Sequence, residues 1–167
     1  GGSTEYVFGK GLEPDKIVSL PFGIVNLTEE FLHNDPPLNY ELESLKNFLD
    51  EEISKVVEEC NVLVGLGGTI TTLVAIEYGI FPYNPREVHG KSLSIDKVMF
   101  WLDTLSGMKE EERIKTFPHI EPKRARVIIP GILIFYRSMI LFGKKEIWVS
   151  DWGLREGIIV EEYMKRD

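Results

Sequence analysis

A short apolar run that ends in two glycines and continues as a helix is the feature that most limits how this chain can fold. The run covers residues 61–66, Gly67 and Gly68 close it, and residues 69–78 have the pattern of a helix. Strand, glycine turn and helix in this order are typical of α/β domains, in which helices cover a sheet. We therefore predict an α/β fold.

Strands are also predicted near both ends of the chain. Residues 4–9 and 16–25 are rich in β-branched and aromatic residues and are separated by turn formers, which predicts a hairpin. Residues 146–150 form a short apolar run, which we expect to be a buried strand. With helices between these strands, and without an internal repeat or a linker, the pattern indicates one domain.

An amphipathic helix is predicted at residues 40–59, where apolar residues recur at intervals of three and four. A short helix should begin near residue 28, capped by Asn26 or Thr28. Within a long apolar helix, Pro130 and Gly131 should impose a kink or a break. The long helix is expected at residues 122–142, and the others at 94–105, 110–116 and 154–165.

Composition limits the function classes. The 167 residues, 43% hydrophobic and 28% charged, suit one globular domain, and no apolar run approaches the roughly 20 residues that span a bilayer. The net charge of −8 argues against loose binding to nucleic acid, which needs a broad basic surface. The single cysteine, Cys60, excludes an internal disulfide and a cysteine-rich zinc site. Because the chain opens at Gly1 without an initiator Met or a basic leader, we expect a cytoplasmic protein whose beginning is missing.

The segment Gly65-Leu66-Gly67-Gly68-Thr69 has the chemistry of a phosphate site. Glycines let backbone amides approach an anion, and the helix that follows presents amides without partners and a partial positive charge. A tight turn capped by Thr69, with glycines for packing alone, is the alternative.

The first five residues are a second candidate. Ser3 and Thr4 could donate to phosphate oxygens, and Glu5 could hold a metal-bound water or act as a base. A Gly-Gly-Ser start is equally typical of a cloning remnant.

Basic residues at a helix start form the third candidate. Lys123, Arg124 and Arg126 oppose the helix dipole there, which hints at an anionic ligand, although pairing with Glu121 would also explain them. Arg155 raises the same question near the last helix.

Two polar residues have open roles. His89 has no second histidine at ligand spacing, so a turn or hydrogen-bonding role is expected. Asp151 could reach a cleft or cap the last helix.

Four motifs, taken in order, resemble the C-terminal half of the exopolyphosphatase and guanosine pentaphosphate phosphatase (Ppx/GppA) family. Residues 1–5 resemble the end of its Asp-x-Gly-Gly-Gly-Ser-Thr-Glu loop, and residues 65–72 resemble its Gly-x-Gly-Gly-Thr-x-x-Thr loop. Residues 88–90 match its Val-His-Gly, and residues 150–157 resemble its Ser-Asp-x-x-Leu-Arg-Glu-Gly ending.

The resemblance implies a ribonuclease-H-like lobe of the actin-like ATPase and sugar kinase superfamily, with a mixed sheet flanked by helices. Residues 1–167 would be one domain, the C-terminal lobe, and its own N-terminal lobe would complete the cleft. The implied metal is Mg²⁺ or another divalent cation, held with the help of Glu5, which is also the implied catalytic residue. Arg124 would select between substrates. The implied phosphate-binding residues are Gly1, Gly2, Ser3, Thr4, Gly65, Gly67, Gly68 and Thr69.

The implied activity is removal of a terminal phosphate from inorganic polyphosphate, from guanosine pentaphosphate of the stringent response, or from both, by metal-assisted attack of water. The loop's Asp, the main catalytic glutamate and the strand that leads into Gly1 are absent, so we expect this chain alone to be inactive and to leave two strand edges unpaired. A non-catalytic alarmone-binding module and a sugar or acetate kinase lobe are the alternatives. A homodimer is possible, and neither membrane nor nucleic acid is an expected partner.

Overall fold

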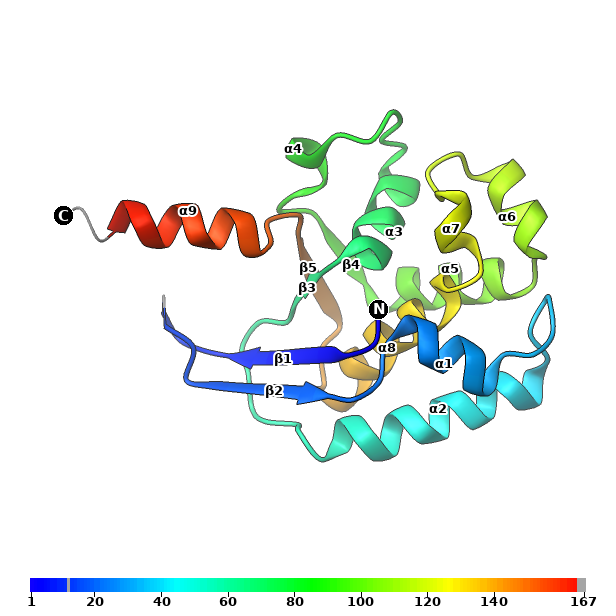
Figure 1. The fold of residues 1–167 in the computed structure, drawn as a ribbon, viewed down its shortest axis with the longest axis horizontal. Coiled ribbons are helices and arrows are strands. Elements are labelled where there is room, and N and C mark those ends of the chain that lie inside the picture. The colour runs from blue at the N-terminus through cyan, green and yellow to red at the C-terminus, as the bar shows by residue number, and fades with distance from the viewer. Residues whose placement is uncertain (12, 165–167) are drawn as a thin grey trace.

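The computed structural model describes residues 1–11 and 13–164 (Figure 1). Two sheets and a set of helices make up this part of the chain. The strands are β1 Thr4–Phe8, β2 Lys16–Leu20, β3 Val64–Leu66, β4 Ser92–Ser94 and β5 Glu146–Ser150. The helices are α1 Ile24–Phe31, α2 Asn39–Ser54, α3 Gly68–Tyr78, α4 Pro85–Val88, α5 Ile95–Ser106, α6 Glu110–Thr116, α7 Pro122–Ala125, α8 Ile128–Leu141 and α9 Leu154–Met164.

The larger sheet is mixed and has the order β3-β5-β4. β3 runs parallel to β5, with Gly65 opposite Val149, and β4 runs antiparallel to β5, with Leu93 opposite Ile147. The predicted α/β architecture with a mixed sheet is therefore confirmed. The predicted hairpin is also present, but β1 and β2 form a separate antiparallel sheet, with Thr4 opposite Leu20.

A cavity of about 700 Å³ lies between the two sheets. All five residues of β1 line it, as do Val64 and Leu66 of β3, and Phe135 and Ile147 contribute apolar walls. Within the described residues, β1 pairs only with β2, and β3 pairs only with β5. Each of these two strands thus keeps an edge without a strand partner beside the cavity.

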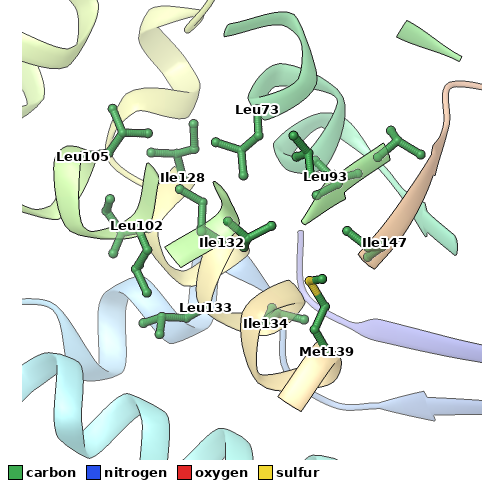
Figure 2. Packing of buried hydrophobic residues seen from close by; sticks show 14 of the residues in the cluster. Leu73, Leu93, Leu102, Leu105, Ile128, Ile132, Leu133, Ile134, Met139 and Ile147 are labelled. Carbon is green, nitrogen blue, oxygen red and sulfur yellow. The ribbon is translucent and has the colours of Figure 1, made fainter. Parts of the chain in front are cut away.

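Helix α8 is the centre of the core. Its sequence is apolar on nearly all sides, a composition that suits a helix surrounded by other elements. Figure 2 shows its residues Ile132, Leu133 and Met139 among side chains from α3, α5 and the larger sheet. Burial of this cluster holds α3 and β5 in place, and these two elements carry the candidate site.

The predicted break at Pro130 and Gly131 is wrong. The helix is interrupted earlier, between Ala125 and Ile128, and Pro130 is the third residue of α8. A proline in the first turn removes no intrahelical hydrogen bond, so it causes no kink there. Gly131 instead admits a close neighbour, because a Cβ atom at this position would lie 2.3 Å from Oγ1 of Thr69.

Other boundaries also differ from the predictions. α1 begins at Ile24 with Gly23 as its N-cap, and Asn26 reaches back to accept a hydrogen bond of 2.6 Å from the Gly23 amide. β5 alternates between buried and exposed residues and so is not a fully buried strand; Trp148 is 45% exposed. Short α4 and β4 were not predicted, because elements of three or four residues show no periodicity.

Helix α9 extends away from the body of the domain (Figure 1). None of its described residues is buried, and Leu154 is 82% exposed. The predicted end of this helix at residue 165 lies outside the described residues. Among the helices that the structure describes, none has the length and apolar character needed to cross a bilayer.

Candidate phosphate-binding site

The glycine turn lies at the carboxyl end of β3, where α3 begins. Gly67 has φ +105°, a conformation that favours glycine, and serves as the N-cap of α3. The first hydrogen bond of the helix runs from the Thr71 amide to the Gly67 carbonyl, at 3.2 Å. The amides before Thr71 belong to the first turn, which has no intrahelical acceptors, so this end of α3 can receive an anion.

Arg124 from α7 lies directly over this turn. A Cβ atom at Gly68 would lie 1.2 Å from Nη1 of Arg124, so the guanidinium occupies the space that glycine leaves free. Nε of Arg124 lies 3.4 Å from Oε2 of Glu121. Two candidates that were proposed separately from the sequence, the glycine turn and the basic cluster, thus form one positively charged site.

The other cations of the basic cluster do not share this site. Lys123 is 79% exposed and pairs with Glu121 at 3.1 Å, as the alternative explanation proposed. Arg126 lines a different cavity of about 240 Å³, together with buried Arg113. Of the cluster, only Arg124 lies at the glycine turn.

A cavity of about 460 Å³ opens beside Gly67, Gly68 and Arg124. Three aromatic side chains in its wall, Phe81, Tyr83 and Trp152, are 60%, 46% and 54% exposed. The sequence analysis did not identify Phe81 and Tyr83, which lie in a loop without a motif, and it assigned no role to Trp152. Their chemistry suits a ligand that has a planar or apolar part.

Asp151 lies in this cavity. The Tyr83 hydroxyl donates to Oδ1 of Asp151, which joins the loop after α3 to the end of β5. Partial burial, followed by the hydrogen bond to the Asp151 carboxylate, raises the pKa of Tyr83 to about 12. Of its two predicted roles, Asp151 therefore has the cleft position. The Gly153 amide beside the start of α9 donates to Glu156 instead, at 2.7 Å.

Two histidines lie around the same cavity. The His89 ring stacks on Trp152 with centroids 4.8 Å apart, and its Nδ1 lies 3.4 Å from Oγ of Ser150, so the predicted hydrogen-bonding role of His89 is confirmed. His119 was not predicted. Both of its ring nitrogens are buried and have no hydrogen-bond partner among the residues that the structure describes, and burial lowers the pKa of His119. Its ring packs edge-on against Phe81, with centroids 5.4 Å apart.

The N-terminal candidate has a hydroxyl-carboxylate arrangement. Oε1 of the exposed Glu5 accepts hydrogen bonds from Ser3 at 2.6 Å and from Ser19 at 3.2 Å. Ser19 was not predicted, because only the fold of the hairpin places it beside Glu5. Thr4 instead donates to the Phe22 carbonyl at 2.8 Å, which ties this segment to the chain before α1.

Both glycine-rich segments line the 700 Å³ cavity. Gly1, Ser3, Thr4 and Glu5 lie on one side of it, and the Gly67–Thr69 turn lies on the other. Two of the predicted phosphate-binding residues line neither this cavity nor the one beside Arg124. These are Gly2 and Gly65; Gly65 is buried, and a Cβ atom there would lie 3.0 Å from Ile147.

Glu5 is the residue at this site that could help to hold a metal ion. The described residues contain no group of three or more histidine, cysteine, aspartate or glutamate side chains arranged for a metal ion. Mg²⁺ often binds through one or two carboxylates together with water and substrate phosphates, so a single carboxylate such as Glu5 fits this ion.

Comparisons with known proteins identify a matching family and a similar fold. The sequence profile of the Ppx/GppA phosphatase family matches residues 1–166. The crystal structure of the Aquifex aeolicus family member superposes with a TM-score of 0.98 at 50% identity, covering all of this chain and 55% of that one.

Two curated relatives are similar in sequence. Exopolyphosphatase 1 of Mycobacterium leprae is 29% identical over 97% of this chain and 49% of its own length. A bifunctional 3-dehydroquinate synthase/phosphatase of Fusobacterium nucleatum is 30% identical over 96% of this chain and 25% of its own length. The chain thus spans a quarter to about half of these relatives.

Proposed function

This chain belongs to the Ppx/GppA phosphatase family, and from that premise we propose that it forms one lobe of a phosphohydrolase that removes the terminal phosphate from inorganic polyphosphate. The observation that carries the proposal is the position of Arg124 over Gly68, at the first turn of α3. The similarity to exopolyphosphatases supports the choice of substrate.

In the proposed mechanism, the residues of this chain bind and neutralise the phosphoryl group. The amides after Gly67 and the Arg124 guanidinium donate to phosphoryl oxygens, and such charge-assisted hydrogen bonds stabilise charge that spreads over these oxygens. Ser3 lines the 700 Å³ cavity, and on binding its hydroxyl exchanges the hydrogen bond to Glu5 for one to the phosphate. Glu5 then orients the attacking water. When bound, Mg²⁺ would be held by Glu5 and would supply charge neutralisation at the phosphate.

A second lobe is part of this proposal. The apolar face of α9, with Ile159 and Tyr163 69% and 70% exposed, has no cover within the described chain. The unpaired edges of β1 and β3 beside the 700 Å³ cavity likewise leave room for one more strand. We propose that the remaining half of an actin-like, two-lobed protein fills both places, and that the chain alone is therefore inactive. A homodimer is compatible with the same exposed surfaces.

Guanosine pentaphosphate is the second candidate substrate. A polyphosphate chain has no ring, whereas the exposed side chains of Phe81, Tyr83 and Trp152 beside Arg124 offer stacking surfaces to a purine. The proposed compartment for either substrate is the cytoplasm, in keeping with the free thiol of Cys60.

Phosphate release by the full-length protein with Mg²⁺ tests the proposal. We expect release from polyphosphate or guanosine pentaphosphate, a large loss in the Arg124→Ala variant, and none from residues 1–167 alone. Tight alarmone binding by calorimetry without hydrolysis would favour a sensor, and phosphoryl transfer from ATP to an acceptor would favour a kinase lobe. Release from neither substrate would reject the proposed function.

A further inference from the structure

A cavity of about 310 Å³ adjoins the aromatic wall of the candidate site. It lies around the loop from α4 to β4. Its lining has a net positive charge although the chain has a net charge of −8, because the two cations Arg86 and Lys91 accompany one acid, Glu87. The lining residues are Tyr78, Ile80, Arg86, Glu87, His89, Gly90 and Lys91.

Arg86 and Lys91 have no carboxylate partner among the described residues, unlike several other cations of the chain. The Lys91 ammonium lies 5.0 Å from the centroid of the Tyr78 ring, which holds it at the cavity wall without neutralising it. Glu87 accepts a hydrogen bond from the side chain of Asn84 at 2.5 Å. The cavity therefore keeps an excess of positive charge that can receive an anion.

This cavity and the candidate site share one wall. Ile80 lines both cavities, and the His89 ring on one side stacks on Trp152 on the other, with centroids 4.8 Å apart. A ligand bound at Gly68 and Arg124 that extended along this wall would reach Arg86 and Lys91. A single phosphate at Arg124 would not, because it has no further groups to extend along the wall.

We propose that Arg86, Lys91 and His89 form a second subsite, which binds inner phosphates of a polyphosphate chain whose terminal phosphate lies at Arg124. The inference rests on the proposed function and adds a dependence on chain length. Linear polyanions gain affinity from each cation that displaces their counterions, and this gain weakens with salt. A long chain can contact both cavities, whereas tripolyphosphate contacts only the first.

The test compares two substrates in the full-length protein with Mg²⁺. For the Arg86→Ala/Lys91→Ala variant, we expect KM for long-chain polyphosphate to rise about tenfold, with KM for tripolyphosphate unchanged within about twofold. The slope of log KM against log salt for the long chain should also become shallower by one to two. Circular dichroism and thermal unfolding would establish that the variant is folded.

The matched control is the Lys109→Ala/Lys115→Ala variant, which removes two positive charges at α6. These two lysines line none of the four cavities described above. Among the described residues, neither pairs with a carboxylate. We expect this control variant to leave both KM values unchanged. An equal rise of the long-chain KM in both double variants would overturn the subsite, as would an equal rise for both substrates in the Arg86/Lys91 variant. If the wild-type protein hydrolyses both substrates and the Arg86→Ala/Lys91→Ala variant has the same two KM values, the subsite fails while the proposed function stands.

Discussion

A Cβ atom at Gly68 would lie 1.2 Å from Nη1 of Arg124, so the absence of a side chain at one residue is what admits the guanidinium of the other. The two residues come from α3 and α7, which are far apart in the sequence. The glycine turn therefore does more than allow close packing, because it brings a positive charge to the first turn of α3.

The first prediction follows from this relationship. Gly68→Ala should lower kcat/KM for polyphosphate at least tenfold, because the added methyl group displaces the Arg124 guanidinium from the amides of α3. The free energy of unfolding should change by less than about 1 kcal/mol, since the clash involves the far end of a flexible side chain and alanine suits a helix. Steady-state kinetics and denaturant unfolding measure the two effects.

A double-mutant cycle separates this mechanism from a general distortion of the turn. In an Arg124→Ala background, Gly68→Ala should cause little additional loss, because the group that it displaces is already gone. Full additivity of the two losses would contradict the explanation.

The second prediction concerns two neighbouring cations with the same carboxylate partner. Arg124→Ala should raise KM at least tenfold, because a charged hydrogen bond contributes about 1.5–3 kcal/mol. Lys123→Ala removes the same charge and also one partner of Glu121, which lies 3.1 Å from Lys123 and 3.4 Å from Arg124. Lys123, however, points to solvent. We therefore expect Lys123→Ala to change KM less than twofold. Equal effects would show that net charge, not the position of Arg124, governs binding.

Much of the fold could be predicted because its signals are local. The bounds of β5 and α6 agree with the predictions, since each is a compact run between turn formers. The break between α7 and α8 was predicted at the wrong residues because a proline disrupts a helix only in its interior, and Pro130 lies in the first turn of α8. The pairing of β3 with β5 joins segments that are distant in the sequence, and periodicity does not report such contacts.

The candidate site could be predicted only in pieces. Glycine-rich turns and a basic cluster have sequence patterns, so Gly68 and Arg124 were both identified. The contact between them and the meeting of Tyr83 with Asp151 arise from tertiary packing. The local charge pattern does not distinguish Arg124 from Lys123, because their orientation on a four-residue helix separates them, and only the family resemblance singled out Arg124.

The third prediction concerns the buried carboxylate of Glu41, which is 2% exposed. It accepts hydrogen bonds from the amides of His33, Asn34 and Leu38 at 2.8, 3.2 and 2.7 Å, and from the Asn34 side chain at 3.0 Å. Burial acts to raise its pKa, but these hydrogen bonds together outweigh burial and lower the pKa below 4.5. The carboxylate therefore contributes stability above pH 4.5, which is lost as the pH falls through the lowered value.

Glu41→Gln should accordingly reduce the free energy of unfolding by about 2–3 kcal/mol at pH 7, because an amide group would face several N–H donors. The difference from wild type should shrink in acid, where Glu41 also loses its charge. Glu43→Gln, at a position on the same helix that is 63% exposed and forms a surface ion pair with Lys46, is the control and should cost less than about 1 kcal/mol. A pH-independent loss at Glu41 would contradict the role of its ionised form.

The fourth prediction concerns the buried hydrogen bond between Tyr6 of β1 and Ser138 of α8, whose oxygens lie 2.6 Å apart. Ser138 donates its one hydroxyl proton to the Ile134 carbonyl at 2.7 Å, so Tyr6 must be the donor in the pair. Tyr6→Phe leaves the Ser138 hydroxyl with its acceptor and should lower the free energy of unfolding by about 1 kcal/mol. Ser138→Ala leaves the buried Tyr6 hydroxyl without an acceptor and should lower it more, by about 1–3 kcal/mol.

Alkaline unfolding gives a second readout of the same pair. Burial raises the pKa of Tyr6 from 10.0 to about 12, an effect that the hydrogen bond to Ser138 partly offsets. Since the folded pKa is raised, this contribution to stability is complete below pH 10 and is lost as the pH rises towards 12. The free energy of unfolding of the wild type should fall by up to about 3 kcal/mol more than that of Tyr6→Phe over this range. Parallel pH profiles for the two proteins would show that Tyr6 ionises freely in the folded state and would refute its burial against α8.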